Sequence, residues 1–169
     1  MKQVVLVLLF IFVFAGICWG NDQIDMVKMK SASQIEYKKA YELYKKISDR
    51  REMLSRPSKE YDELDYLYEV SDKYTDYCKA LKAMSNIAFQ VDGCDNNCKK
   101  DLNYKFQSGV YDHMGELVGL GMAIRGGREY INTPLGVEYF FKLKDTIDAG
   151  LINFNHILKI DLPYFKFAE

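Results

Sequence analysis

The clearest pattern in the chain is a continuous apolar seam between residues 58 and 91. Its members recur in steps of three and four residues, which is the spacing of one helix face. No polar residue interrupts the seam, and Ser58 stands where a helix N-cap is expected. A seam this regular predicts a helix packed lengthwise against another helix. It comprises Leu67, Val70, Tyr74, Tyr77, Leu81, Met84, Ala88 and Val91.

A second helical pattern lies before Pro57, whose ring cannot continue a helix. Ser33 and Glu36 have the spacing of a capping box, in which two side chains satisfy the free backbone N–H groups of a helix start. The sequence therefore predicts a helix that begins at Ser33. Apolar and aromatic residues then follow at helical spacing, at Tyr37, Ala40, Tyr41, Tyr44 and Ile47.

A third helix is predicted after the turn at residues 94–98, with Asn96 or Asn97 as its N-cap. Gly115, Gly119 and Ala123 fall four residues apart. They predict a flat strip on which another helix can approach closely. Gly126 and Gly127 end this segment, whose apolar positions are Leu102, Phe106, Val110, Met114, Leu117, Gly121 and Ile124.

The last helix is predicted to start at Thr133 and Pro134, with threonine as the cap and proline in the first turn. Gly150 is a candidate break within it, and Pro163 ends the helical pattern. No segment alternates like a β-strand, and no repeat is present. The fold class predicted is all-α, an antiparallel bundle of four to five helices behind a cleaved signal peptide.

Residues 1–20 have the three zones of a secretory signal. Lys2 is followed by an apolar run over residues 4–15, and small residues precede a cut expected after Gly20. The run is shorter than the roughly 20 residues that a membrane span needs, although an uncleaved anchor is the alternative. We expect residues 21–169 to form a single helical domain that is secreted and has no membrane span.

The charge balance and the cysteine content limit the kinds of partner and of disulfide that the protein can have. Loss of Lys2 with the signal leaves 22 basic and 24 acidic residues without a long basic cluster, which disfavours nucleic-acid binding. The mature part contains three cysteines, and the oxidising environment of the secretory pathway would permit one disulfide bond among them. We expect this disulfide between Cys94 and Cys98, with Cys78 free and shielded, because a long second helix would separate Cys78 from both.

Catalytic and metal-binding signatures are weak. His113 and Glu116 share a helix face and could touch a metal, but a polar surface pair is the simpler interpretation. A zinc site at the cysteines is likewise less favoured than a disulfide. Phosphate-binding and hydrolase motifs are absent from the sequence. We therefore predict no enzyme activity, no cofactor and no metal.

Tyrosine is the unusual component, because all 13 tyrosines lie in the mature part and eight fall between Tyr37 and Tyr77. Tyr66 and Tyr68 are the candidate interface residues, since tyrosine is enriched where proteins bind one another. Ordinary packing at the core boundary is the alternative for them. The function predicted is a secreted, non-catalytic module that binds an extracellular protein or surface. The main alternative is a carrier of a small apolar ligand or lipid between its helices, and a secreted enzyme is a third, less favoured one.

Overall fold

A computed structural model describes residues 26–87 and 95–158 of the chain. Within these residues the protein is all-helical and contains no strand, which confirms the predicted class. Four long α-helices are joined by short connections, and one 3-10 helix separates the last two. Their bounds are α2 Met26–Glu52, α3 Lys59–Ile87, α4 Asn96–Gly126, η1 Gly127–Tyr130 and α5 Pro134–Leu158.

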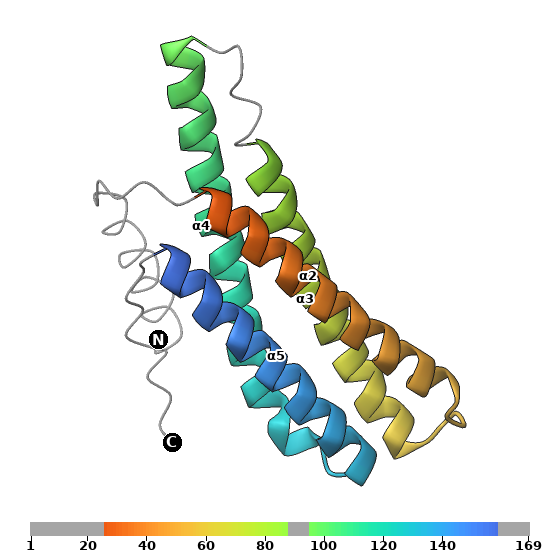
Figure 1. Ribbon diagram of the computed structural model, residues 1–169. Helices are drawn as coiled ribbons and strands as arrows, with labels where there is room; N and C mark the ends of the chain where they lie inside the picture. Colours follow the sequence, from red (N-terminus) through yellow and green to blue (C-terminus); the bar gives the residue numbers. More distant parts are fainter. Residues whose placement is uncertain (1–25, 88–94, 159–169) are drawn as a thin grey trace.

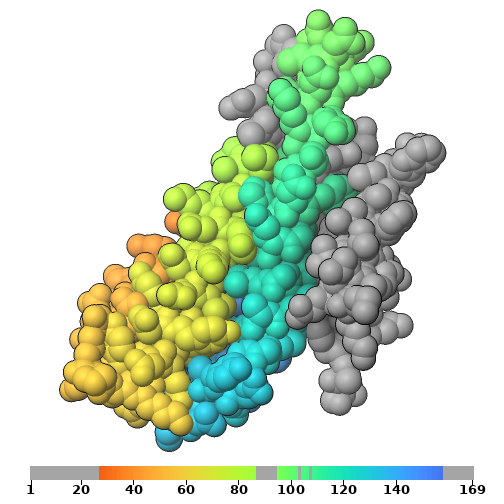
Figure 2. Space-filling model, turned by 180° about the vertical axis from the view of Figure 1, so that it is seen from behind, coloured from red at the N-terminus to blue at the C-terminus, as the bar shows by residue number. Residues whose placement is uncertain are grey.

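The helices lie in two antiparallel pairs (Figure 1). Helix α2 packs along most of α3, and α5 returns along α4. The pairs then meet, because α3 also lies against α4 and both α2 and α3 contact α5. The first turns of α4 project beyond the ends of the other described helices, and Phe106 is the first described residue of α4 that is buried. Seen from behind, α3 and α4 run side by side (Figure 2).

Two of the predicted helix starts are confirmed. The Tyr61 N–H donates to Ser58 Oγ at 3.1 Å at the beginning of α3. At the beginning of α5, the Gly136 N–H donates to Thr133 Oγ1 at 3.0 Å, and Pro134 is the first helical residue. The predicted cap of α4 is wrong: Asp95, rather than Asn96 or Asn97, accepts the free N–H groups.

The predicted start of the first helix is wrong. Helix α2 begins at Met26, so Ser33 and Glu36 lie inside it and do not form a capping box. Met29 continues the apolar face toward the N-terminus and is fully buried, and its burial favours the extra turns. Ser33 donates its hydroxyl to the Met29 carbonyl at 2.5 Å, a bond that a serine can make within a helix.

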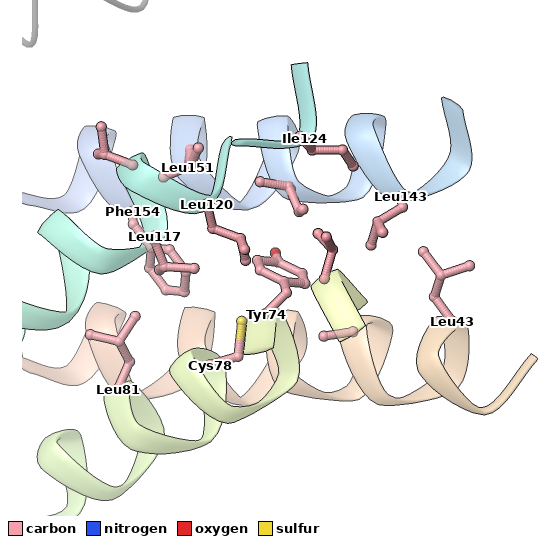
Figure 3. Packing of buried hydrophobic residues seen from close by; sticks show 14 of the residues in the cluster. Leu43, Tyr74, Cys78, Leu81, Leu117, Leu120, Ile124, Leu143, Leu151 and Phe154 are labelled. Atoms are coloured by element: carbon pink, nitrogen blue, oxygen red, sulfur yellow. The ribbon is translucent and has the colours of Figure 1, made fainter. Parts of the chain in front are cut away.

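The hydrophobic core is formed by one face of each α-helix. Figure 3 shows side chains from all four helices meeting around the ring of Tyr74, which is fully buried. The predicted seam on α3 is confirmed at its described core positions, since Leu67, Val70 and Leu81 are buried and Tyr77 and Met84 are half-buried. Ala88 and Val91, the last members of the seam, fall outside the described residues.

The glycines do not act as predicted. Gly119 and Ala123 are exposed, and a Cβ added to Gly119 would meet no atom within 4 Å, so the predicted close-packing strip is wrong there. The close contacts on α4 are instead at Gly109 and Gly121, where an added Cβ would lie 2.7 Å from Met84 and 3.0 Å from Leu151. The break considered at Gly150 is also wrong, because α5 continues through it.

No helix among the described residues is long and apolar enough to cross a membrane. The predicted signal peptide, its cut after Gly20, Cys94 and Pro163 all lie outside those residues.

Candidate functional site

A row of stacked tyrosines lines the outer edge between α2 and α3. Tyr37, Tyr41 and Tyr44 each follow a buried residue of α2 by one position, so they lie beside the core face and point toward the neighbouring helix and solvent. Ring centroids are 6.1 Å apart between Tyr37 and Tyr41 and 6.3 Å apart between Tyr41 and Tyr44. Tyr68 of α3 completes the row, 5.0 Å from Tyr44. We call these four residues the tyrosine stripe.

The two helices are joined within the stripe by a hydrogen bond between phenols. The hydroxyl oxygens of Tyr44 and Tyr68 are 2.7 Å apart. This bond, followed by burial and by the electrostatic effects of Tyr68 and Asp72, raises the pKa of Tyr44 to about 12. The Tyr44 phenol therefore stays protonated at neutral pH, and the hydrogen bond restrains both rings.

Cations lie at both ends of the stripe. The Arg51 guanidinium is 3.8 Å from the ring centroid of Tyr68, and it also pairs with Asp65 at 2.7 Å. At the other end, Lys82 Nζ is 5.0 Å from the ring centroid of Tyr37. Such cation–π contacts add about 0.5–1 kcal/mol each at exposed sites. They hold the two terminal rings of the stripe in place.

Exposure differs along the stripe. Tyr41, at its middle, is 49% exposed, whereas Tyr37, Tyr44 and Tyr68 are half-buried. Tyr41 is therefore the member of the stripe that is most accessible from solvent.

The structure does not bring the two predicted interface residues together. Tyr68 belongs to the stripe, but Tyr66 lies on the opposite side of α3, where its hydroxyl donates to the Ala123 carbonyl at 3.3 Å. A Cβ added to Gly127 would lie 2.2 Å from that hydroxyl, so the Tyr66 side chain lies directly on the backbone at the end of α4. The interface role of both residues stays a prediction, and the geometry favours Tyr68.

Sequence reasoning assigned Tyr37, Tyr41 and Tyr44 to a helix face but did not single them out as a site. The signal that could have found them is their offset of one residue from the apolar positions. The pairing with Tyr68 was not visible, because it depends on the register between α2 and α3.

Cys78 is a free, buried thiol, as predicted. Burial is the main cause that raises its pKa to about 12, so the reactive thiolate is scarce at neutral pH. Cys98 lies in the first turn of α4. Its predicted bond to Cys94 stays a prediction, because Cys94 is outside the described residues.

A polar cluster that the sequence did not indicate lies between α2, α3 and α5. Glu36 is 1% exposed, and its Oε1 accepts from Lys39 at 2.9 Å and from Asn153 at 3.4 Å. The Tyr74 hydroxyl donates to the Thr146 carbonyl at 3.2 Å. Gly150 leaves room for that hydroxyl, which would lie 2.2 Å from an added Cβ. These bonds tie three helices together, a structural role.

His113 and Glu116 do meet, with Nδ1 and Oε2 2.8 Å apart. The described residues contain no group of three potential metal ligands. Among the described features, the tyrosine stripe is the one best suited to binding another molecule, because its aromatic rings are ordered and partly exposed. No protein-family model matches the chain, and no curated protein or solved structure matches it either.

Proposed function

We propose that the protein is a secreted, non-catalytic binding module that contacts an extracellular partner through the tyrosine stripe. The observation that carries the proposal is a row of four tyrosines in ring contact on an outer edge, with a half-exposed ring at its centre. Aromatic residues that are packed from behind and partly exposed are typical of binding hot spots.

The energetics favour binding at this edge. A tyrosine side chain buries a large area on binding and loses little conformational entropy, because it has few rotatable torsions. In the stripe most of that freedom is already lost, because Tyr41 is stacked on both sides and Tyr44 is hydrogen-bonded to Tyr68. A partner that covers Tyr41 therefore gains contact area with little further ordering cost.

Site-specific photocrosslinking tests the proposed contact. A photoreactive phenylalanine analogue replaces Tyr41, and in a control protein it replaces Phe141 of α5, whose exposed fraction is nearly the same. Irradiation in the extracellular fluid of the source organism should give one discrete adduct from position 41 and none from position 141. Identical adducts from both positions, or none from position 41, would contradict the proposal.

Secretion is supported by the Lys2 n-region, the apolar run over residues 4–15 and the small residues up to Gly20. A Cys94–Cys98 bridge would suit that route. Trp19 is the single tryptophan of the chain, so cleavage after Gly20 leaves a protein with tyrosine fluorescence alone. Tryptophan emission from the extracellular protein would show that the segment is retained.

The carrier of an apolar ligand is the competing proposal. It requires a hollow of several hundred cubic ångströms between helices. Native mass spectrometry of protein secreted by a eukaryotic host separates the two, because the module should appear at the bare polypeptide mass. A stoichiometric lipid adduct would favour the carrier instead.

A further inference from the structure

We infer that the partner presents an acidic polypeptide segment, which docks along α2 with Tyr41 as its anchor between Lys38 and Lys45. The inference rests on the proposed function and adds the chemical class of the partner. Its evidence is the distribution of charge around the tyrosine stripe.

Helix α2 is the basic helix of the described chain. It carries eight basic and four acidic residues, whereas α3 carries four basic and seven acidic ones. The excess is larger at the surface of α2, because the Glu36 carboxylate is buried. The solvent side of α2 is therefore positively charged and attracts an anionic partner.

The lysines beside Tyr41 are available to a partner. The ion pair of Lys38 with Glu42 is 4.0 Å long and its side chains are 80% and 57% exposed, so water screens it. Lys45 is exposed and forms no ion pair with another described residue. Both ammonium groups can exchange water for a carboxylate at small cost.

The geometry places the two lysines on either side of the ring. Lys38 precedes Tyr41 by three residues and Lys45 follows it by four, so all three lie on one edge of α2. Seven residues of helix separate the lysines by roughly 10 Å along the axis. An extended peptide covers that length in about three residues. Two carboxylates about three residues apart, with an apolar or aromatic side chain between them, would match this edge.

Mixed charge on α2 favours a polypeptide over a uniformly anionic surface. Glu42, Asp49 and Glu52 are exposed on the same helix and interrupt its cations. These carboxylates would repel the uniform negative charge of a sulfated polysaccharide or an anionic membrane. A peptide can present neutral or basic side chains opposite them.

The test uses a random copolymer of glutamate and tyrosine as the acidic polypeptide, with heparin and phosphatidylserine vesicles as the other arms. Binding to the secreted protein is measured by biolayer interferometry at low and physiological salt. Lys38→Glu with Lys45→Glu should weaken copolymer binding at least about tenfold, and Tyr41→Ser should weaken it further. The matched control, Lys99→Glu with Lys100→Glu at the start of α4, makes the same change in net charge and should leave binding within about twofold.

The outcomes separate this inference from the proposed function. Equal weakening by the α2 and α4 double variants, or no copolymer binding, would overturn the acidic-peptide inference. Heparin or vesicle binding that depends on Lys38 and Lys45 while the copolymer fails would overturn it too. In each case a crosslink at position 41 would still support a partner at the stripe. Circular dichroism of every variant checks that the helices are intact.

Discussion

Glu63 holds the start of α5 from across the bundle, and replacing it with glutamine should destabilise the fold. The Glu63 side chain is 5% exposed. Its Oε1 accepts the Asn132 N–H at 2.9 Å, and its Oε2 accepts the Thr133 hydroxyl at 2.6 Å and the Thr133 N–H at 3.0 Å. Thr133 in turn caps α5, so the carboxylate lies at the positive end of that helix dipole.

The magnitude follows from these contacts. Hydrogen bonds to a charged group contribute about 1.5–3 kcal/mol each, against about 1 kcal/mol for neutral ones. Glutamine removes the charge and places an N–H₂ donor among groups that are themselves donors. With the helix dipole adding about 0.3–1 kcal/mol, Glu63→Gln should lower the free energy of unfolding by about 3 kcal/mol. The urea midpoint should fall by roughly 1–2 M.

The pH dependence has a definite sign. Burial raises the pKa of Glu63, but the bonds from the Thr133 hydroxyl and from the backbone N–H groups of Asn132 and Thr133 outweigh it and lower the pKa overall. A lowered pKa in the folded state stabilises the protein above the unfolded value of about 4.3. This stabilisation is lost as the pH falls through the folded pKa.

Urea unfolding followed by circular dichroism at pH 7 and at pH 3 measures both effects. The wild type should exceed Glu63→Gln in stability at pH 7, and the difference should shrink at pH 3. Glu69→Gln, a change at an exposed position of the same helix, should be nearly neutral. A Glu63→Gln midpoint equal to that of the wild type at pH 7, or a gap unchanged at pH 3, would refute the reasoning.

Two further substitutions and one labelling experiment probe the core. Leu81→Ala, at a fully buried position, should lower the free energy of unfolding by about 2–5 kcal/mol, while Ile35→Ala, half-exposed on α2, should cost far less; equal losses would place Leu81 at the surface. Gly150→Ala should cost about 1–3 kcal/mol by overpacking against the Tyr74 hydroxyl, and Tyr74→Phe in that background should recover part of the loss. Cys78 should react with Ellman's reagent far more slowly in the native protein than in urea, and equal rates would contradict its burial.

Helix existence was predictable because it depends on local patterns. Ser58 and Thr133 capped their helices as predicted, and Leu81 lies in the core because its neighbours at three- and four-residue steps are apolar. The start of α2 failed for a physical reason: a good capping sequence at Ser33 competed with the burial of Met29, and burial decided the outcome.

The polar contacts between helices could not be predicted, because they join residues far apart in the sequence. Glu63 and Thr133 are separated by 70 positions, and Glu36 meets Asn153 across the interface of α2 with α5. Considered with their sequence neighbours, Glu63 and Asn153 look like ordinary surface residues, and Glu36 and Thr133 look like local helix-capping residues. The tyrosine stripe could be predicted only in part. Three of its members share one helix, but Tyr68 joins them only through the register between α2 and α3.

The projecting end of α4 has a consequence for local opening. From Asn96 to Lys105 no described side chain is buried, so tertiary packing contributes little to holding these turns. The first turn of this stretch is capped by the Asp95 side chain, which accepts hydrogen bonds from the Asn97 and Cys98 N–H groups. The amide protons of this stretch should therefore exchange with solvent by fraying, without global unfolding, whereas those around Leu117 should exchange only when the bundle opens. One helix thus spans two regimes of stability, and Phe106 marks the boundary between them.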